Sequence, residues 1–261
     1  MKIALHGATG RMGLALAALA RAEANVAIVG AAAAPGDPGV GKDLGDLAGG
    51  GSLGVEVTED VASALLGADV VIDFTVARAV RPLLALAARA KVAVVSGTTN
   101  LDAETLAALE RTALTVPVLW APNMSLGVQV LAELVEMAVR KLGPGFDAEI
   151  VEIHHRRKVD SPSGTAKRLA DAVRAARPDA REIHGRDGEV GARTDAEVAV
   201  LGVRGGDVVG DHTVYLLGPS ERIELTHRAS NRDVFAHGAL RAARFLVGKA
   251  AGRYTIADVL R

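Results

Sequence analysis

Lys2-Ile-Ala-Leu-His-Gly-Ala-Thr-Gly-Arg-Met-Gly13 is the stretch that decides the fold of this 261-residue chain. Residues 3–6 form a near-continuous apolar run that predicts a buried strand, and the pattern over residues 12–22 predicts a helix. Gly7, Gly10 and Gly13 lie between them in a G-x-x-G-x-x-G spacing, a relative of the G-x-G-x-x-G fingerprint. Such glycines allow a tight turn, the approach of a pyrophosphate to the backbone, and close helix–sheet packing. We therefore interpret the stretch as a dinucleotide-binding turn rather than as a purely structural one.

The next hundred residues repeat this alternation of strand and helix. Four further apolar runs are typical of parallel strands that are covered on both faces: residues 26–30, 70–74, 92–96 and 118–120. Helical patterns lie at residues 61–66, 78–90 and 103–113. The segment over residues 33–54 is rich in Gly, Pro and Asp, which predicts a long loop. This order predicts an α/β fold with an open, doubly wound parallel sheet.

The pattern changes after a long helix expected over residues 125–142, which Gly143-Pro-Gly145 ends. A second sheet is expected from strands at residues 148–153, 198–203, 213–217 and 222–226. A helix over residues 166–176 and a polar stretch over 178–194 lie between the first two of these strands. This second region is predicted to be α+β. The last apolar run, residues 234–247, predicts a helix that could belong to either region.

Composition and charge argue against several classes of protein. The 30 Lys and Arg residues nearly balance the 31 Asp and Glu residues, so nucleic acid and anionic membrane surfaces are not expected partners. The sequence shows no signal-peptide pattern and no run of about 18 apolar residues, so we expect a cytoplasmic protein. The chain has no cysteine, and its adjacent histidines lie in a cationic run that would repel a metal ion. We therefore predict no structural metal.

The clearest chemical signal is His154-His-Arg-Arg-Lys158, a cluster of basic side chains in a nearly neutral chain. Ser163-Gly-Thr165 follows it closely and has the pattern of a helix N-terminus, whose free N–H groups bind carboxylate or phosphate oxygens. Two anion-binding devices thus converge on one short segment. They indicate a site for a small molecule that carries more than one negative charge and must receive a proton. The alternative is a solvated basic turn without function.

Three further segments follow predicted strands of the first sheet. Ser96-Gly-Thr-Thr99 and Ala121-Pro-Asn-Met-Ser125 offer backbone N–H groups and small polar side chains. Asp73-Phe-Thr75 occupies the same edge, where Thr75 is equally well explained as a helix N-cap. Open α/β sheets bind their ligands at the carboxyl ends of their strands. We therefore expect these segments to contribute to the dinucleotide site.

With these motifs the chain resembles the 4-hydroxy-tetrahydrodipicolinate reductase family, the lysine-pathway enzymes also called dihydrodipicolinate reductases. The resemblance depends on the Gly7 to Gly13 turn, Gly97-Thr-Thr99 and Ala121-Pro-Asn-Met124. Above all it depends on residues 152–166, with their His-His-x-x-Lys-x-Asp-x-Pro-Ser-Gly-Thr-Ala pattern. It implies NADH- or NADPH-dependent reduction of a cyclic dicarboxylate to tetrahydrodipicolinate.

The resemblance also implies the organisation of the molecule. A Rossmann-like dinucleotide-binding domain is expected over residues 1–125 plus 236–261, completed by the C-terminal helix. A substrate-binding and oligomerisation domain is expected over residues 126–235, and the family usually forms a homotetramer.

The resemblance assigns roles that suit the residue types. His154 is the acid/base candidate, and Lys158 takes the family's proton-donor role, because neighbouring cations should make its ammonium release a proton more readily. His155 and the N–H groups of Gly164 and Thr165 would hold the substrate carboxylates. The roles of Arg156 and Arg157 stay open, and we assign none to His6, His184, His212, His227 or His237. The expected cofactor-binding residues are Gly7, Ala8, Thr9, Gly10, Arg11, Met12, Gly97, Thr98, Thr99, Ala121, Pro122, Asn123 and Met124.

The chain departs from the family pattern after the second strand, where an acid normally binds the adenine ribose of NADH. Ala34 stands where the family often has an acid, and Pro35 where it often has a base. Asp37 could reach the ribose if the loop folds back, and Arg11 or Lys42 could meet a 2′-phosphate. We therefore expect both cofactors to be used.

Two other functions fit part of the sequence. One is a different dehydrogenase of Rossmann type, acting on an amino acid or keto acid. The other is a non-enzymatic dinucleotide sensor, which needs the glycine turn but has no use for a proton-donating cationic cluster.

Overall fold

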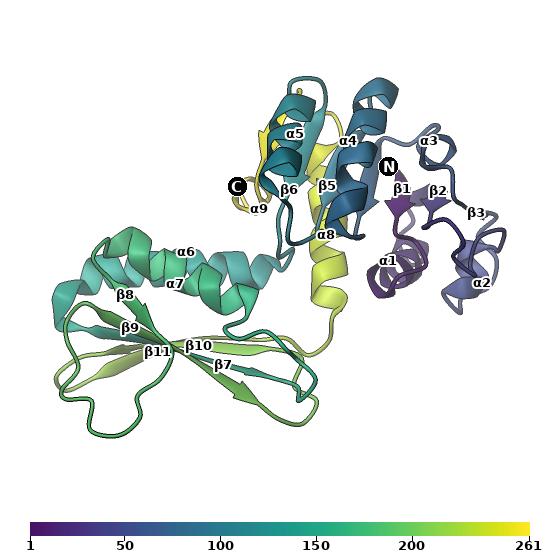
Figure 1. The fold of residues 1–261 in the computed structure, drawn as a ribbon. Coiled ribbons are helices and arrows are strands. Elements are labelled where there is room, and N and C mark those ends of the chain that lie inside the picture. The colour runs from purple at the N-terminus through teal and green to yellow at the C-terminus, as the bar shows by residue number, and fades with distance from the viewer. The chain divides into compact units, whose positions relative to one another are not determined.

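The computed structural model describes residues 1–261 and divides the chain into two compact units. The first unit combines Met1–Ser125 with Asp233–Arg261, and the second is Leu126–Arg232. The C-terminal helix α8 (Asp233–Leu246), yellow in Figure 1, packs on α1 and on strands of the first sheet. The helix whose place the sequence pattern left open therefore belongs to the first unit.

The first unit contains a seven-stranded parallel sheet in the order β12-β6-β5-β4-β1-β2-β3. The chain runs outward from β1 to β3 and then returns to place β4 on the other side of β1, which makes β1/β4 the switch point of the sheet. This confirms the predicted Rossmann-like α/β fold. The strands are β1 (Lys2–His6), β2 (Ala27–Ala32), β3 (Val57–Thr58), β4 (Val70–Asp73), β5 (Ala93–Ser96), β6 (Pro117–Trp120) and β12 (Gly252–Tyr254).

Helices cover both faces of this sheet because its strands are apolar on both faces. One row of neighbouring side chains packs in a core with α4 and α5, namely Ala4, Val71, Val94 and Val118. The next row points to the opposite face and is also fully buried: Leu5, Ile72, Val95 and Leu119. The helices of this unit are α1 (Arg11–Arg21), α2 (Leu44–Leu47), α3 (Val61–Ala64), α4 (Ala77–Ala90), α5 (Ala103–Ala113), α8 and α9 (Ile256–Val259).

The segment expected to be a loop, residues 33–54, contains the short helix α2. Its N-cap residue Asp43 accepts hydrogen bonds from the backbone N–H groups of Gly45 and Asp46. The same carboxylate also accepts from the N–H groups of Leu53 and Val55, which folds the loop around one side chain. These bonds, the one from Leu53 above all, hold the pKa of Asp43 well below its usual value.

The second unit contains a five-stranded mixed sheet in the order β11-β10-β7-β9-β8, which confirms the predicted α+β region. Helices α6 and α7 lie side by side on one face of it (Figure 1). The three-residue edge strand β8 lies within residues 178–194, which were predicted only as a polar stretch between strands. The elements are α6 (Leu126–Leu142), the 3-10 helix η1 (Gly143–Gly145), β7 (Asp147–His154), α7 (Gly164–Ala176), β8 (Arg181–Ile183), β9 (Glu197–Arg204), β10 (Asp211–Leu217) and β11 (Arg222–Arg228).

Along strand β7, the side chains on the face covered by the helices change from apolar to polar. Ala148 and Ile150 join the core beneath α6 and α7, and the next two residues on that face are Glu152 and His154. On the neighbouring strand β10, His212 lies directly opposite Glu152. The period-two alternation of a strand thus buries a carboxylate and two imidazoles at one end of the face.

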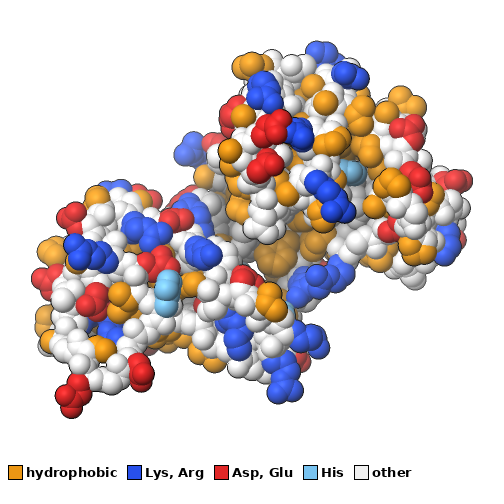
Figure 2. Space-filling view, viewed as in Figure 1, with side chains coloured by type: hydrophobic (Ala, Val, Ile, Leu, Met, Phe, Trp, Pro, Cys, Tyr) orange, Lys and Arg blue, Asp and Glu red, His pale blue; other side chains and the backbone are white.

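Charged side chains of both signs are interspersed on the face of the molecule shown in Figure 2, as the formal net charge of −1 would suggest. No helix in the structure combines the length and the apolar character that a membrane span requires.

Candidate active site

The glycine turn after β1 has the geometry that its three glycines were expected to provide. Gly7 has a φ of +82°, and a Cβ at that position would lie 2.6 Å from the carbonyl oxygen of Phe74. A Cβ at Gly13 would overlap the carbonyl oxygens of Gly7 and Ala8. The N-cap residue of α1, Gly10, places no side chain on the first N–H groups of the helix. An uncapped helix start behind a glycine turn fits a pyrophosphate.

The other predicted cofactor segments lie at the same edge of the sheet. His6, Asp73, Ser96 and Trp120 are the last residues of β1, β4, β5 and β6, and adjacent members pair in register. The segments that follow them are residues 7–13, 74–76, 97–99 and 121–124. The parallel pairing therefore brings the predicted cofactor residues to one carboxyl edge.

The structure corrects one reading at this edge. Val76, not Thr75, is the N-cap residue of α4, and no side chain caps that helix. Thr75 instead donates its hydroxyl to Asp73 Oδ1 at 2.7 Å. The N-cap alternative for Thr75 is therefore wrong.

A buried carboxylate organises the polar end of the second unit. Glu152 is fully buried, and its oxygens lie 2.5 Å from His154 Nδ1 and 2.7 and 2.8 Å from the two terminal nitrogens of Arg204. The backbone N–H of Ser163 donates to Oε1 at 3.1 Å. Burial alone would raise the pKa of Glu152, but Arg204 and His154 outweigh it and hold the pKa below its usual value. Glu152 is therefore ionised at neutral pH.

Glu152 fixes the orientation of the neighbouring imidazole. Because the carboxylate accepts from Nδ1, the neutral ring of His154 carries its proton there, and Nε2 is the atom that can exchange a proton. A Cβ at Gly210 would lie 2.9 Å from Nε2, so the glycine leaves space beside that atom. Burial lowers the pKa of His154, and Glu152 opposes the shift. His154 is thus mostly neutral at pH 7.

Lys158 lies on the turn that follows β7, close enough to His154 for its charge to contribute to the lowered pKa of His154. Its Nζ donates to both carboxylate oxygens of Asp160, at 2.8 and 2.9 Å. Asp160 therefore places a carboxylate beside this ammonium, in addition to the neighbouring cations Arg156 and Arg157. Both of those arginines are exposed.

The predicted carboxylate-binding residues follow on either side of this turn. His155 Nδ1 is buried without a hydrogen-bond partner, and Nε2 lies 3.4 Å from a terminal nitrogen of Arg232. Gly164 and Thr165 begin α7, whose N-cap residue Ser163 accepts from the N–H of Ala166 at 3.1 Å. Through Ser163, the helix start is attached to Glu152.

Sequence reasoning missed His212 as part of this cluster. Its ring lies edge-on to His154 with 5.0 Å between ring centroids, and its Nε2 lies 2.9 Å from Ser163 Oγ. Burial, followed by the charge of His154, lowers the pKa of His212 to about 3. The Ser163 hydroxyl therefore donates to a neutral ring, and Nδ1 stays buried without a partner. The available signal was its alternation with the apolar Val214 and Leu216 along one strand.

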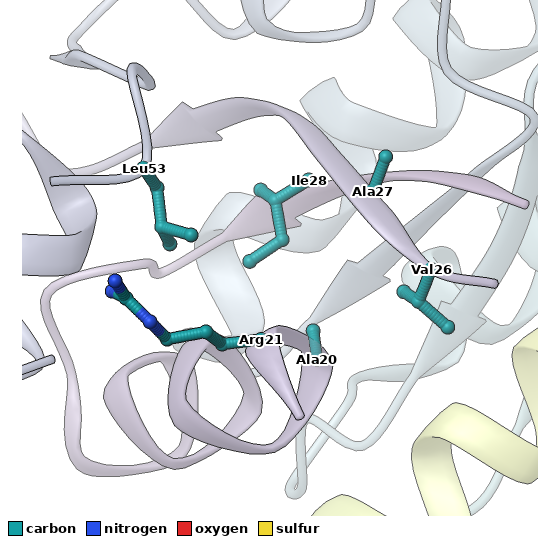
Figure 3. Close-up of a pocket in the computed structure, with 6 residues that line it drawn as sticks. All are labelled: Ala20, Arg21, Val26, Ala27, Ile28 and Leu53. Atoms are coloured by element: carbon teal, nitrogen blue, oxygen red, sulfur yellow. The ribbon is translucent and has the colours of Figure 1, made fainter. Parts of the chain in front are cut away.

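A cavity of about 240 Å³ lies elsewhere in the first unit, at the amino end of β2. Figure 3 shows that its lining is aliphatic apart from Arg21, which already donates to the carbonyl of Gly51. This cavity holds no acid/base or nucleophilic group. The lining residues are Ala20, Arg21, Val26, Ala27, Ile28 and Leu53.

Comparison with known proteins shows similarity along almost the whole chain. Residues 1–124 match the family model described as dihydrodipicolinate reductase, N-terminus, and residues 127–260 match the one described as dihydrodipicolinate reductase, C-terminus. The 4-hydroxy-tetrahydrodipicolinate reductase of Anaeromyxobacter dehalogenans (strain 2CP-1 / ATCC BAA-258) is 50% identical over 99% of this chain and 97% of that protein. The enzyme of the same name from Myxococcus xanthus (strain DK1622) is 47% identical over 100% of this chain and 97% of that protein.

Among solved structures, the fold is similar to dipicolinate-bound dihydrodipicolinate reductase from Paenisporosarcina sp. TG-14. The TM-score is 0.81 at 22% identity, and the match covers 100% of this chain and 99% of that one. A scyllo-inositol dehydrogenase from Lactobacillus casei, solved with NAD(H) and scyllo-inositol, has a TM-score of 0.58 at 16% identity and covers 100% and 93% of the two chains. Both similarities concern the fold alone.

Proposed function

This chain belongs to the dihydrodipicolinate reductase family, and from that membership we propose how its residues carry out the family's reaction. The reaction is the NAD(P)H-dependent reduction of 4-hydroxy-tetrahydrodipicolinate to tetrahydrodipicolinate in lysine and diaminopimelate biosynthesis. Two family models that together span nearly the whole chain, and a relative that is 50% identical over 99% of it, support this activity. The protein is an oxidoreductase.

The observation that carries the proposal is the buried Glu152–His154 pair beside Lys158. Loss of the 4-hydroxyl group as water gives a conjugated imine. Hydride addition to this imine places negative charge on the ring, which a proton must neutralise. Glu152 holds the ring proton of His154 on Nδ1, so Nε2 can take up a proton and pass it on. Lys158 supplies the proton. When bound, a reduced nicotinamide dinucleotide supplies the hydride.

The carboxylates of the substrate need cationic or N–H partners. We assign them to His155 and to the N–H groups of Gly164 and Thr165 at the start of α7. Anchoring at two carboxylates fixes the ring relative to the proton donor, which makes the transfer effectively unimolecular. The dinucleotide is assigned to residues 7–12, 97–99 and 121–124, with the first unit as the dinucleotide-binding domain and the second as the substrate domain.

The end of β2 supports the use of both NADH and NADPH. Ala34 and Pro35 are exposed and carry no charge that could select at the ribose 2′ position. The loop does fold back onto the glycine turn, but Asp37 is already engaged, since Oδ2 accepts from the Thr9 hydroxyl and Oδ1 from the Gly39 N–H, both at 2.8 Å. We therefore propose that the enzyme uses both NADH and NADPH.

The second sheet supports self-association. Helices α6 and α7 pack on one face only. The opposite face carries partly exposed apolar side chains, including Ile153 and Val203. A second copy of this face would cover them, and closed symmetry would then give the homotetramer that we propose. We place the enzyme in the cytoplasm, since its reaction consumes reduced nicotinamide dinucleotide.

A coupled assay tests the proposed activity. Purified protein is mixed with freshly generated 4-hydroxy-tetrahydrodipicolinate and either NADH or NADPH, and cofactor absorbance is followed. We expect substrate-dependent oxidation of the cofactor. A panel of linear and cyclic dicarboxylates serves as the control for a different dehydrogenase. Cofactor oxidation with a linear dicarboxylate such as a keto diacid, but not with the cyclic substrate, would reject the proposal.

A further inference from the structure

Asp73 is a fully buried carboxylate in the first unit that the proposed chemistry does not use. It is the last residue of β4, at the switch point of the sheet, and its side chain accepts four hydrogen bonds. The donors are His6 Nδ1 at 2.8 Å, Thr75 Oγ1 at 2.7 Å, Ser96 Oγ at 2.6 Å and Thr98 Oγ1 at 2.8 Å. They come from the end of β1, the end of β5, and the loops after β4 and β5.

Burial of the Asp73 charge lowers the stability of the fold, and the fold does not require a charge at this position. The adjacent row of the same strands is entirely aliphatic and equally buried. Burying an unpaired carboxylate is strongly unfavourable, so the four donors are what permit it. Burial would raise the pKa of Asp73, but His6 and the hydroxyls outweigh it and hold the pKa below its usual value. Asp73 is therefore an ionised centre placed at the ligand edge.

The bonds around Asp73 also connect the loops to each other. Thr98 Oγ1 accepts from the backbone N–H of Thr75 at 2.9 Å, and the Trp120 indole donates to the Thr98 carbonyl at 2.8 Å. The backbone N–H of Gly97 donates to the Asp73 carbonyl, and that of Phe74 to the His6 carbonyl. One carboxylate thus fixes the loops after β4 and β5 to the strand that leads into the glycine turn.

The position of this centre in the sheet indicates what the loops hold. In doubly wound sheets the strand after the glycine turn, here β2, reads the adenine ribose, and the ligand crosses the switch point. The opposite side, β4 and β5, then faces the nicotinamide half. We propose that Asp73 is a positioning residue for the nicotinamide end of the cofactor, and that His6 acts with it by donating Nδ1–H to its carboxylate. This inference rests on the proposed function for the identity of the cofactor.

The test compares three variants at His6 and Ser96 by NADH fluorescence titration, which needs no substrate. His6→Ala removes the donor to Asp73, whereas His6→Asn returns an N–H near the position of Nδ1. Ser96→Ala removes a different donor and keeps the imidazole. We expect the Kd for NADH to rise about tenfold or more in His6→Ala, to return to within about threefold of the original in His6→Asn, and to rise about threefold in Ser96→Ala.

Steady-state kinetics separate positioning from general damage. The KM for NADH should follow the Kd in each variant, while the KM for the dicarboxylate should change less than about twofold. Thr112→Val, which removes a buried hydroxyl from α5 in the same unit, is the matched control and should leave the Kd for NADH unchanged. Thermal unfolding shows whether each variant is folded. If His6→Ala is not folded, the NADH Kd of Ser96→Ala decides the test.

Two results would overturn the proposal. One is an unchanged NADH Kd in folded His6→Ala together with an unchanged Kd in Ser96→Ala. The other is a loss in His6→Ala that His6→Asn does not restore, since the imidazole would then act through Nε2 rather than through Asp73. Normal NADH titrations with no reductase activity would reject the proposed function and leave this inference standing.

Discussion

Glu152 has no access to solvent, and four hydrogen bonds from His154, Arg204 and Ser163 surround its carboxylate. Arg204 balances the charge of Glu152, and burial keeps the oriented His154 ring neutral rather than held as an imidazolium. Ser163 connects the same carboxylate to the start of α7. One residue therefore sets the tautomer of the proposed proton-transfer group and the position of the helix to which we assign the substrate carboxylates. Removing Arg204 would leave the charge of Glu152 without its main compensation.

At the residue scale, we expect His212 to make stability depend on pH. Its folded pKa of about 3 lies below the unfolded value of about 6.5, so between these pH values the unfolded chain binds more protons. Stability is therefore fully present above pH 6.5 and falls as the pH falls towards 3. Between pH 7 and pH 5 the loss is about 2 kcal/mol.

Urea unfolding of the second unit at pH 7 and pH 5 measures this loss. His212→Gln removes the titrating ring, and the difference between the two pH values should shrink by about the same amount. An equal pH dependence in the variant would show that the titration belongs to another group.

The cofactor selectivity is also decided by single residues. With uncharged Ala34 and Pro35 at the end of β2, we expect kcat/KM for NADH and NADPH to agree within about tenfold, which is less than about 1.4 kcal/mol of discrimination. Ala34→Glu should shift the ratio towards NADH, because the new carboxylate accepts from the ribose and repels a 2′-phosphate. A ratio above about a hundredfold in the original chain would mean that another residue reads the 2′ position.

At the element scale, the long strands and helices could be predicted to within one or two residues in most cases because their apolar periods repeat. The short elements β3, β12 and α9 could not, since two to four residues show no period. β12 exists because it pairs with β6, about 135 positions earlier in the chain. The candidate catalytic segment could be predicted because residues 154–165 are contiguous. Arg204 and His212 reach it only through pairing across the sheet.

In the proposed function, substrate binding depends most on the position of the start of α7. Ser163→Ala removes the N-cap bond to Ala166 and the donor to His212, so we expect about 1 kcal/mol less stability and a several-fold higher KM for the dicarboxylate. The value of kcat should change less, because carboxylate anchoring precedes the transition state.

Thr255→Ala provides the comparison for Ser163→Ala. Thr255 caps α9 in the first unit with a complete capping box, so its loss should cost similar stability and leave the KM for the dicarboxylate unchanged. If the two variants raise this KM equally, substrate anchoring does not depend on the start of α7.

At the scale of the whole molecule, we expect the uncovered face of the second sheet to drive assembly. Light scattering at micromolar concentration should give the mass of four 26.8 kDa chains. Val203→Glu places a charge on that face, where Val203 is 47% exposed in the single chain, and should shift the mass towards smaller species. A monomer in the unsubstituted protein would refute the proposed tetramer.

The central claim is that His154 and Lys158 transfer the proton in the reduction of 4-hydroxy-tetrahydrodipicolinate. The most direct measurement is kcat for His154→Gln and Lys158→Ala, with NADH titration of each variant and Lys141→Ala, an exposed lysine on α6, as the control. Positioned proton transfer contributes about 10²–10⁴-fold, so we expect each variant to lose at least about a hundredfold in kcat and to bind NADH normally. Near-normal turnover in either variant would contradict the assignment.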